Sequence, residues 1–224
     1  MKVRIFEDPL LFRINGLPIT ETMITSLGVS VALLACALLL RNSAFRRPDS
    51  QVALFARLTV KWLDNMVKQI VGRPEPGIAT LSGSLFIFIA ASNIAGHLPG
   101  VYPPTASLAT TSALAIIVFL AVPAFGIRAR GFAGYLKHYF RPNPLLLPLH
   151  LISEFSRTLA LAFRLFGNIM SGHLLVALLI SLSGFLVPMP FMALDLLIGL
   201  LQAYIFAILS TVFISAAVGA GENE

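Results

Sequence analysis

The hydrophobic residues of this chain fall into five long apolar runs, separated by short polar or proline-containing stretches. These runs cover residues 19–40, 78–98, 106–127, 149–182 and 191–218. A helix rises about 1.5 Å per residue, so about 20 apolar residues cross a hydrocarbon core of about 30 Å. The pattern therefore predicts an all-α polytopic membrane protein, a single membrane domain with about five membrane-crossing helices.

Residues 51–71 have a different pattern, in which charged and apolar side chains recur at helical spacing on opposite sides. The polar side carries Arg57, Lys61, Asp64, Asn65 and Lys68, and the apolar side carries Phe55, Leu58, Trp62, Met66 and Ile70. This pattern predicts an amphipathic helix in the membrane interface, with its basic residues toward the lipid headgroups. An ordinary helix packed on a neighbouring subunit is the alternative.

The last two apolar runs are longer than a single crossing requires. As continuous helices, residues 149–182 would span about 51 Å and residues 191–218 about 42 Å. We expect them to form a hairpin about the turn at 183–190, tilted well beyond the usual ~20°. Such a pair leaves room above and below it for two aqueous half-passages or for a curved partner surface.

The composition supports a membrane protein without a sizeable soluble domain. Of 224 residues, 57% are hydrophobic and 12% are charged. A single cysteine, Cys36, rules out an intrachain disulfide. The first residues, MKVRIFEDPL, lack the pattern of a cleavable signal peptide. We expect no metal, no cofactor and no nucleic-acid partner, and no phosphate-binding GxxxxGK motif is present.

The basic residues predict the orientation of the chain. Residues 41–77 contain seven Lys and Arg, residues 98–105 contain none, and residues 128–141 contain four. Cytoplasmic loops carry the excess of basic residues, so the two basic loops are expected inside and the proline-rich turn outside. With five crossings, the N-terminus is then outside and the C-terminus is cytoplasmic.

Arg164 lies in the middle of the fourth apolar run. An arginine there costs about 2.5–3.5 kcal/mol on insertion scales and cannot lose its proton, so it needs a partner or a function. At about 100° per residue, a polar stripe shares its face of the helix. The stripe consists of His150, Ser153, Glu154, Arg157, Arg164, Asn168 and Ser171. No acid stands three or four residues from Arg164, so a balancing carboxylate must come from elsewhere in this chain or from another chain; a structural ion pair is the alternative role.

His173 falls on the opposite face of the same helix, in a different environment. In an antiparallel hairpin, His173 and Asp195 lie at roughly similar distances from the turn, which makes them a plausible proton-transfer pair. Gln202 lies seven residues after Asp195, on the same face of the last helix. Alternatively, Asp195 accepts hydrogen bonds from a backbone or serine group. His97 lies at the end of the second apolar run. It is either an ordinary residue of the membrane interface or a ligand.

Three segments carry a resemblance to a known family. RLFGNIMSGHLL, LQAYIF and ASNIAGHLPGVYPPT are similar to segments of subunit a of the rotary F-type ATP synthase, and the resemblance covers roughly residues 52–217. It implies that Arg164 is the stator arginine facing the ring of c subunits, with Asn168 and Gln202 near it. Glu154 matches an acidic residue that is often found upstream of the arginine in this family. His173 and Asp195 match a His and acid pair, although Asp is one methylene shorter than the Glu of many members, so a water is expected to bridge them.

The resemblance also implies a mechanism and a set of partners. The chain would translocate ions without being an enzyme itself, and ATP chemistry would occur on the soluble ATPase sector, reached indirectly. Its direct partners would be the c ring, the peripheral-stalk b subunits and the lipid of a bacterial inner membrane. The outer passage would be lined by His173 and Asp195 with Asn93 or His97, and the inner passage by Glu154 and His150. A secondary ion transporter or a structural membrane subunit are the alternatives, but we find no internal repeat of the kind many transporters have.

Overall fold

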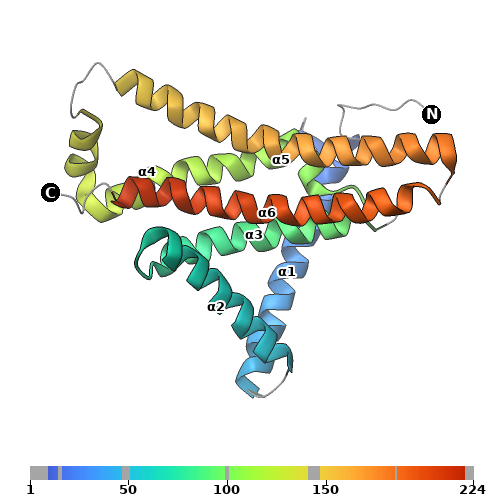
Figure 1. Ribbon diagram of the computed structural model, residues 1–224, viewed down its shortest axis with the longest axis horizontal. Coiled ribbons are helices and arrows are strands. Elements are labelled where there is room, and N and C mark those ends of the chain that lie inside the picture. The colour runs from blue at the N-terminus through green and yellow to red at the C-terminus, as the bar shows by residue number, and fades with distance from the viewer. Residues whose placement is uncertain are drawn as a thin grey trace.

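The computed structural model describes residues 10–14, 17–46, 51–98, 101–140, 147–184 and 186–219. Its helices are α1 Glu21–Arg46, α2 Gln51–Val71, α3 Pro76–Gly96, α4 Leu108–Phe140, α5 Leu147–Ser183 and α6 Pro188–Gly219, with a short 3₁₀ helix, η1, at Pro104–Ala106 (Figure 1). Among these residues, five helices are long and apolar enough to cross a membrane. The prediction of an all-α polytopic membrane protein is confirmed.

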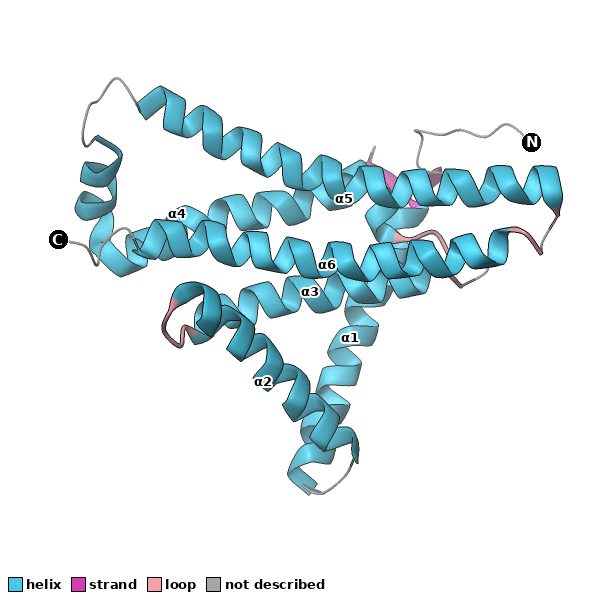
Figure 2. Ribbon diagram, viewed as in Figure 1, coloured by secondary structure: helices cyan, strands magenta, loops and turns pink. Residues whose placement is uncertain are grey.

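Ahead of α1 lies a small antiparallel hairpin that the hydrophobic pattern did not predict (Figure 2). Strand β1 Leu10–Ile14 pairs with β2 Leu17–Thr20. Two strands of four or five residues carry too little periodicity to be recognised in a mixed polar and apolar segment. Residues 1–9, where we expect no cleavable signal peptide, lie outside the described residues, as do residues 220–224.

Three helix boundaries differ from those predicted. α1 continues through 41–46 of the expected basic loop, because no helix breaker occurs before Pro48. α4 continues past its expected end at 127 to Phe140, across a kink at Gly131, whose φ of 73° suits a residue without a Cβ. α6 begins at Pro188, inside the expected turn, because proline is well tolerated in the first turn of a helix. Residues 141–146, which connect α4 to α5, lie outside the described part of the chain.

α2 is amphipathic. Its charged side chains are exposed, and the buried positions are Ala53, Leu63, Met66 and Val67. Of the expected apolar side, Met66 is buried and Trp62 contacts the ring of Phe86 on α3, whereas Leu58 is exposed. The side chain of Phe55 lies outside the described part. α2 therefore presents both a basic and an apolar surface to its surroundings.

Helices α3, α4, α5 and α6 run side by side along the long axis of the molecule, whereas α1 and α2 cross that direction (Figure 1). α3 and α6 pack closely because small residues line their interface. Thr211 Oγ1 donates a 2.8 Å hydrogen bond to Ser82 Oγ, and Gly83, Ala203 and Ala207 are fully or largely buried nearby. Small side chains allow membrane helices to approach closely, and hydroxyl pairs join them.

α5 and α6 form the antiparallel hairpin that the sequence predicts. Their 37 and 32 residues correspond to helices of about 55 and 48 Å, well beyond a hydrocarbon core of about 30 Å. α1 lies across their direction (Figure 1). A strong tilt of the hairpin in the membrane stays our prediction, since helices of this length fit the core only when inclined.

Candidate functional site

The polar stripe of α5 faces away from the rest of the chain. Its members His150, Ser153, Arg157, Arg164, Asn168 and Ser171 are all exposed, and Glu154 is half-buried. The adjoining face carries the buried residues Leu161, Ala162, Leu165 and Ile169, which pack in the core against α3, α4 and α6. The packing of this helix therefore directs its intramembrane charges to the outer surface of the subunit.

Arg164 is exposed at the middle of this stripe. Within the described ranges, no carboxylate lies within ion-pair distance of its guanidinium group. Arg157, two turns earlier, differs: its guanidinium carbon lies 4.7 Å from the ring centroid of Phe213, a cation–π contact within the chain. In the part of the chain that the structure describes, no carboxylate therefore balances the charge of Arg164.

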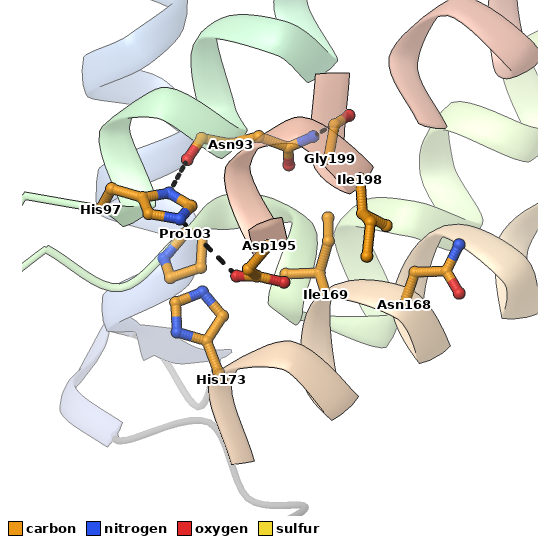
Figure 3. Close-up of a pocket in the computed structure, with 9 residues that line it drawn as sticks. All are labelled: Asn93, His97, Pro103, Asn168, Ile169, His173, Asp195, Ile198 and Gly199. Atoms are coloured by element: carbon orange, nitrogen blue, oxygen red, sulfur yellow. Dashed lines mark hydrogen bonds and ion pairs between the residues drawn. The ribbon is translucent and has the colours of Figure 1, made fainter. Parts of the chain in front are cut away.

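A second group of ionisable side chains lies on the opposite side of α5, where α3, α5 and α6 meet. The imidazoles of His97 and His173 and the carboxylate of Asp195 point toward one another (Figure 3). The ring centroids of the two histidines are 6.4 Å apart, and His97 Nε2 lies 3.7 Å from Asp195 Oδ2. The expected proximity of His173 to Asp195 is therefore present, but the ion pair of Asp195 is made with His97.

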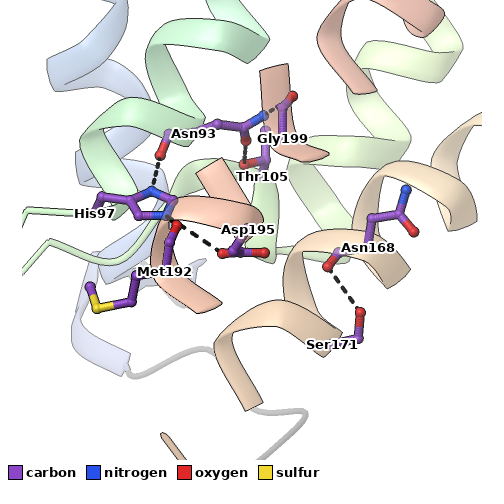
Figure 4. Close-up of polar contacts among 8 residues, drawn as sticks. All are labelled: Asn93, His97, Thr105, Asn168, Ser171, Met192, Asp195 and Gly199. Carbon is purple, nitrogen blue, oxygen red and sulfur yellow. Dashed lines mark hydrogen bonds and ion pairs between the residues drawn. The ribbon is translucent and has the colours of Figure 1, made fainter. Parts of the chain in front are cut away.

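The ring of His97 contacts acceptors through both of its nitrogens (Figure 4). Nδ1 lies 2.9 Å from the carbonyl oxygen of Asn93, and Nε2 lies 3.1 Å from the carbonyl oxygen of Met192 on α6. The backbone N–H of His97 donates to Ile94 instead, so the histidine side chain satisfies a carbonyl left over at the end of α3. His97 therefore caps α3 and joins it to α6.

Asn93 holds the same corner of the fold together. Its Nδ2 donates a 2.7 Å hydrogen bond to the carbonyl of Gly199, and its Oδ1 accepts one of 3.0 Å from Thr105 on η1. Both side chains are almost completely buried. The amide of Asn93 is thus engaged in structural bonds and fixes the position of His97 one helical turn away.

A hydrogen bond connects the exposed stripe of α5 to α6. Asn168 Nδ2 donates to Gln202 Oε1 over 2.9 Å. Gln202 is only 3% exposed, and its Nε2 has no acceptor among the described residues. Asn168 therefore ties the exposed stripe that contains Arg164 to the buried face of α6.

Two hollows meet at Asp195. A narrow pocket of about 10 Å³ lies on the α3 side, lined by Asn93, His97 and His173 among others (Figure 3). A groove of about 310 Å³ lies on the other side, between α5 and α6, lined by Ser171, Leu175, Val176, Phe191 and Leu194. Asn168, Asp195 and Ile198 border both. The narrow pocket is near the lower limit for one water molecule, whereas the groove has room for several.

Gly172 allows Asp195 to lie directly against α5. A Cβ atom built at this position would overlap Oδ1 of Asp195. The absence of a side chain at residue 172 is therefore a requirement of the site and not only of helix packing.

The structure does not bring every predicted residue into this cluster. Glu154 and His150 lie near the N-terminal end of α5, well before Arg164 and away from His173. Conversely, the structural roles of Asn93 and Thr105 were missed, although the i, i+4 spacing of Asn93 and His97 at the end of an apolar run was a usable signal. Among the described residues, no cluster of His, Cys, Asp and Glu is suited to hold a metal ion.

Five long apolar helices among the described residues define a multi-pass membrane protein. Residues 23–215 match the family described as ATP synthase A chain. The chain is 43% identical over 211 residues to ATP synthase subunit a 2 of Bradyrhizobium sp. (strain BTAi1), covering 94% of each chain. It is 42% identical to ATP synthase subunit a of Legionella pneumophila subsp. pneumophila (strain Philadelphia 1), covering 94% of this chain and 92% of the relative.

A third relative, ATP synthase subunit a 2 of Picosynechococcus sp. (strain ATCC 27264 / PCC 7002 / PR-6), is 54% identical over 151 residues, 67% of this chain and 64% of the relative. The chain therefore belongs to the ATP synthase A chain family. This membership confirms the resemblance found in the sequence.

Proposed function

We propose that this chain is the ion-translocating stator subunit of an F-type ATP synthase, with Arg164 as its fixed working charge. The observation that carries the proposal is the exposure of Arg164 on the outward face of α5, with no carboxylate of the described residues within ion-pair distance. A permanent cation on an apolar surface needs an anionic partner. A carboxylate on each subunit of a c ring, arriving in turn as the ring rotates, would supply it.

The charge of Arg164 accounts for ion release. At about 4 Å and an effective dielectric constant of about 20, it would stabilise an ionised carboxylate by about 4 kcal/mol, roughly a thousandfold. An arriving carboxylate therefore loses its ion to one passage, passes Arg164 ionised, and reloads from the other passage. Because the guanidinium cannot be neutralised, it also blocks direct ion flow between the passages.

The two half-passages are assigned to the two ends of the tilted hairpin. We assign His173, Asp195, Asn93 and His97 to the outer one, which the groove between α5 and α6 supports because it reaches Asp195 and Asn168. Glu154 and His150 are assigned to the inner one, motivated by their position near the start of α5. The hydrogen bond between Asn168 and Gln202 would fix α5 against α6 next to Arg164.

This function implies the surroundings of the chain. We infer contacts with the c ring along α5, with b subunits of the peripheral stalk, and only indirectly with the soluble ATPase sector. From the distribution of basic residues, we infer that α2 and the C-terminus lie on the cytoplasmic side of a bacterial inner membrane and the N-terminus outside.

The direct test is ATP-driven ion pumping by the assembled complex in vesicles. Arg164→Ala is expected to abolish pumping while the complex still assembles, and Arg128→Ala, on an exposed surface of α4, serves as the matched control. Pumping that survives in Arg164→Ala would show that the arginine is structural. Gradient-driven ion transport by the chain without a c ring and without ATP would instead indicate a secondary transporter.

A further inference from the structure

We propose that the outer face of α2 binds anionic phospholipids and that these lipids hold α2 against α6. The inference goes beyond the proposed function and does not depend on the role of Arg164. The sequence predicts an interfacial position for α2, to which we add the charge of the lipid and a consequence for α6. The site consists of the exposed side chains of Arg57, Lys61, Trp62 and Lys68.

The three basic residues of this site form one row along α2. At about 100° per residue, positions 57, 61 and 68 fall within about 40° of one another around the helix. None of the three cations lies within ion-pair distance of a carboxylate in the described part of the chain. Asp64 is the one acid in the sequence of α2, so this face keeps a net positive charge. Such a face is complementary to an anionic membrane surface.

Apolar side chains lie beside the basic row. Leu58 and Trp62 are 55% and 46% exposed, on the side of the row where Trp62 follows Lys61. Tryptophan is enriched where one part of its ring meets hydrocarbon and the other meets water. Cations next to exposed apolar side chains are typical of a helix at the boundary between headgroups and acyl chains. A phospholipid offers both parts in one partner, a charged headgroup and its acyl chains.

The connections of α2 keep it at one membrane surface. The candidate crossing of α1 ends at Arg41 and that of α3 begins at Pro76, so α2 joins the ends of two consecutive crossings (Figure 1). Consecutive crossings run in opposite directions, so both ends of α2 lie at the same surface. α2 itself is not among the five candidate crossings found in the described residues. The basic row therefore lies at the level of the headgroups, where its charge favours the anionic ones.

The opposite side of α2 contacts α6. Met66 and Val67 are buried in a core that also contains Ala207 of α6. The ring centroids of Trp62 and Tyr204, on α6, are 5.7 Å apart, so the indole joins the lipid-facing surface to this helix. α2 is thus held from within by this core and from outside by lipid. Because α6 is one of the two hairpin helices, loss of the lipid should also loosen the packing of the hairpin.

The cations form an extended row and not a single pocket. Arg57 and Lys68 are eleven residues apart, about 16 Å along the helix, so they reach different lipid molecules of one leaflet. A basic residue beside an anionic leaflet contributes about fivefold to the binding constant. With Asp64 opposing one of the three cations, the expected preference for anionic over zwitterionic lipid is about 25-fold.

Trp62 is the single tryptophan of the chain, so its fluorescence reports the lipids at this site. The full chain is reconstituted in vesicles of equal parts phosphatidylcholine and phosphatidylglycerol, with brominated acyl chains, which quench tryptophan, on one lipid or the other. Quenching should show a preference of about 25-fold for phosphatidylglycerol, the anionic lipid. Lys61→Gln should lower this preference about fivefold, and the triple variant Arg57→Gln, Lys61→Gln, Lys68→Gln should abolish it. Arg128→Gln, on an exposed surface of α4, is the matched control and should keep the wild-type preference.

The consequence for α6 is measured on the complete complex. Its thermal stability should be lower in phosphatidylcholine vesicles than in the mixed vesicles, and the triple variant should not respond to the change of lipid. Equal stability of the wild-type complex in both vesicles would overturn the link to α6.

Equal quenching by both lipids in the wild-type chain, or an unchanged preference in Lys61→Gln and in the triple variant, would overturn the lipid site. An unchanged preference together with loss of peripheral-stalk subunits from the triple variant would assign the basic row to a protein partner instead. The pumping test of Arg164 is independent of these outcomes, because the quenching measurement needs neither ATP nor a c ring.

Discussion

Asn168 on α5 donates a 2.9 Å hydrogen bond to the side-chain oxygen of Gln202 on α6, and this bond joins the exposed charged face of one helix to the buried face of the other. Asn168 is one turn after Arg164 and directly precedes the buried Ile169, so it lies at the edge of the packed face of α5. This side-chain pair therefore adds a polar link next to Arg164 to the apolar packing of α5 against α6.

Asn168→Ala removes this bond and leaves the buried amide of Gln202 without its donor. The loss should cost about 1–3 kcal/mol, the usual penalty for an unsatisfied buried polar group, and should reduce ATP-driven pumping. Gln202→Ala combined with Asn168→Ala should be less harmful than the sum of the single changes, because the unsatisfied group is gone. The pumping rates of the wild type, the two single variants and the double variant form a double-mutant cycle that measures this coupling. Additive losses would contradict it.

Gly172→Ala should displace the carboxylate of Asp195 from α5. Since a Cβ at this position overlaps Oδ1, either Asp195 rotates away from His97 or the two helices separate. Displacements of this size commonly reduce rates by about a hundredfold. Pumping assays on Gly172→Ala and on Gly28→Ala, where nothing lies near the added atom, should show a loss only in the first.

Ser82→Leu should destabilise the packing of α3 on α6. Ser82 is fully buried and accepts hydrogen bonds from Thr211 and Ser210, so a larger apolar side chain both overfills the interface and removes two bonds. Overpacking costs about 1–3 kcal/mol. The thermal stability of the purified complex should fall, whereas Ser84→Leu, two residues away on the exposed side, should leave it unchanged.

The groove between α5 and α6 should be accessible to water. In a chain with Cys36 replaced by alanine, a cysteine at Ser171 or Leu175 should react with a charged thiol reagent, because both positions line the groove. A cysteine at the buried Leu161 should not react. Sealed cysteines at both groove positions in the assembled complex would contradict our assignment of the outer passage; the same method at His150 and Glu154 tests the inner one.

Much of this protein follows from the sequence by itself. Apolar runs of sufficient length determine five membrane-crossing helices, because a bilayer leaves no other partner for their backbone groups. Helical periodicity alone places Arg164, Asn168 and Ser171 on one face, and an arginine at that depth requires a partner whatever the fold. The three segments RLFGNIMSGHLL, LQAYIF and ASNIAGHLPGVYPPT also suffice to indicate the family.

Only the tertiary structure decided which polar groups meet. His97 lies 98 residues before Asp195 along the chain, and no periodicity reports a contact between residues that far apart. It arises because small side chains let α3 and α6 approach closely, while Asn93 and Thr105 fix the end of α3 in place. The exposed direction of Arg164 was decided in the same way, since the packing of Leu161, Leu165 and Ile169 in the core leaves its face of α5 for a partner.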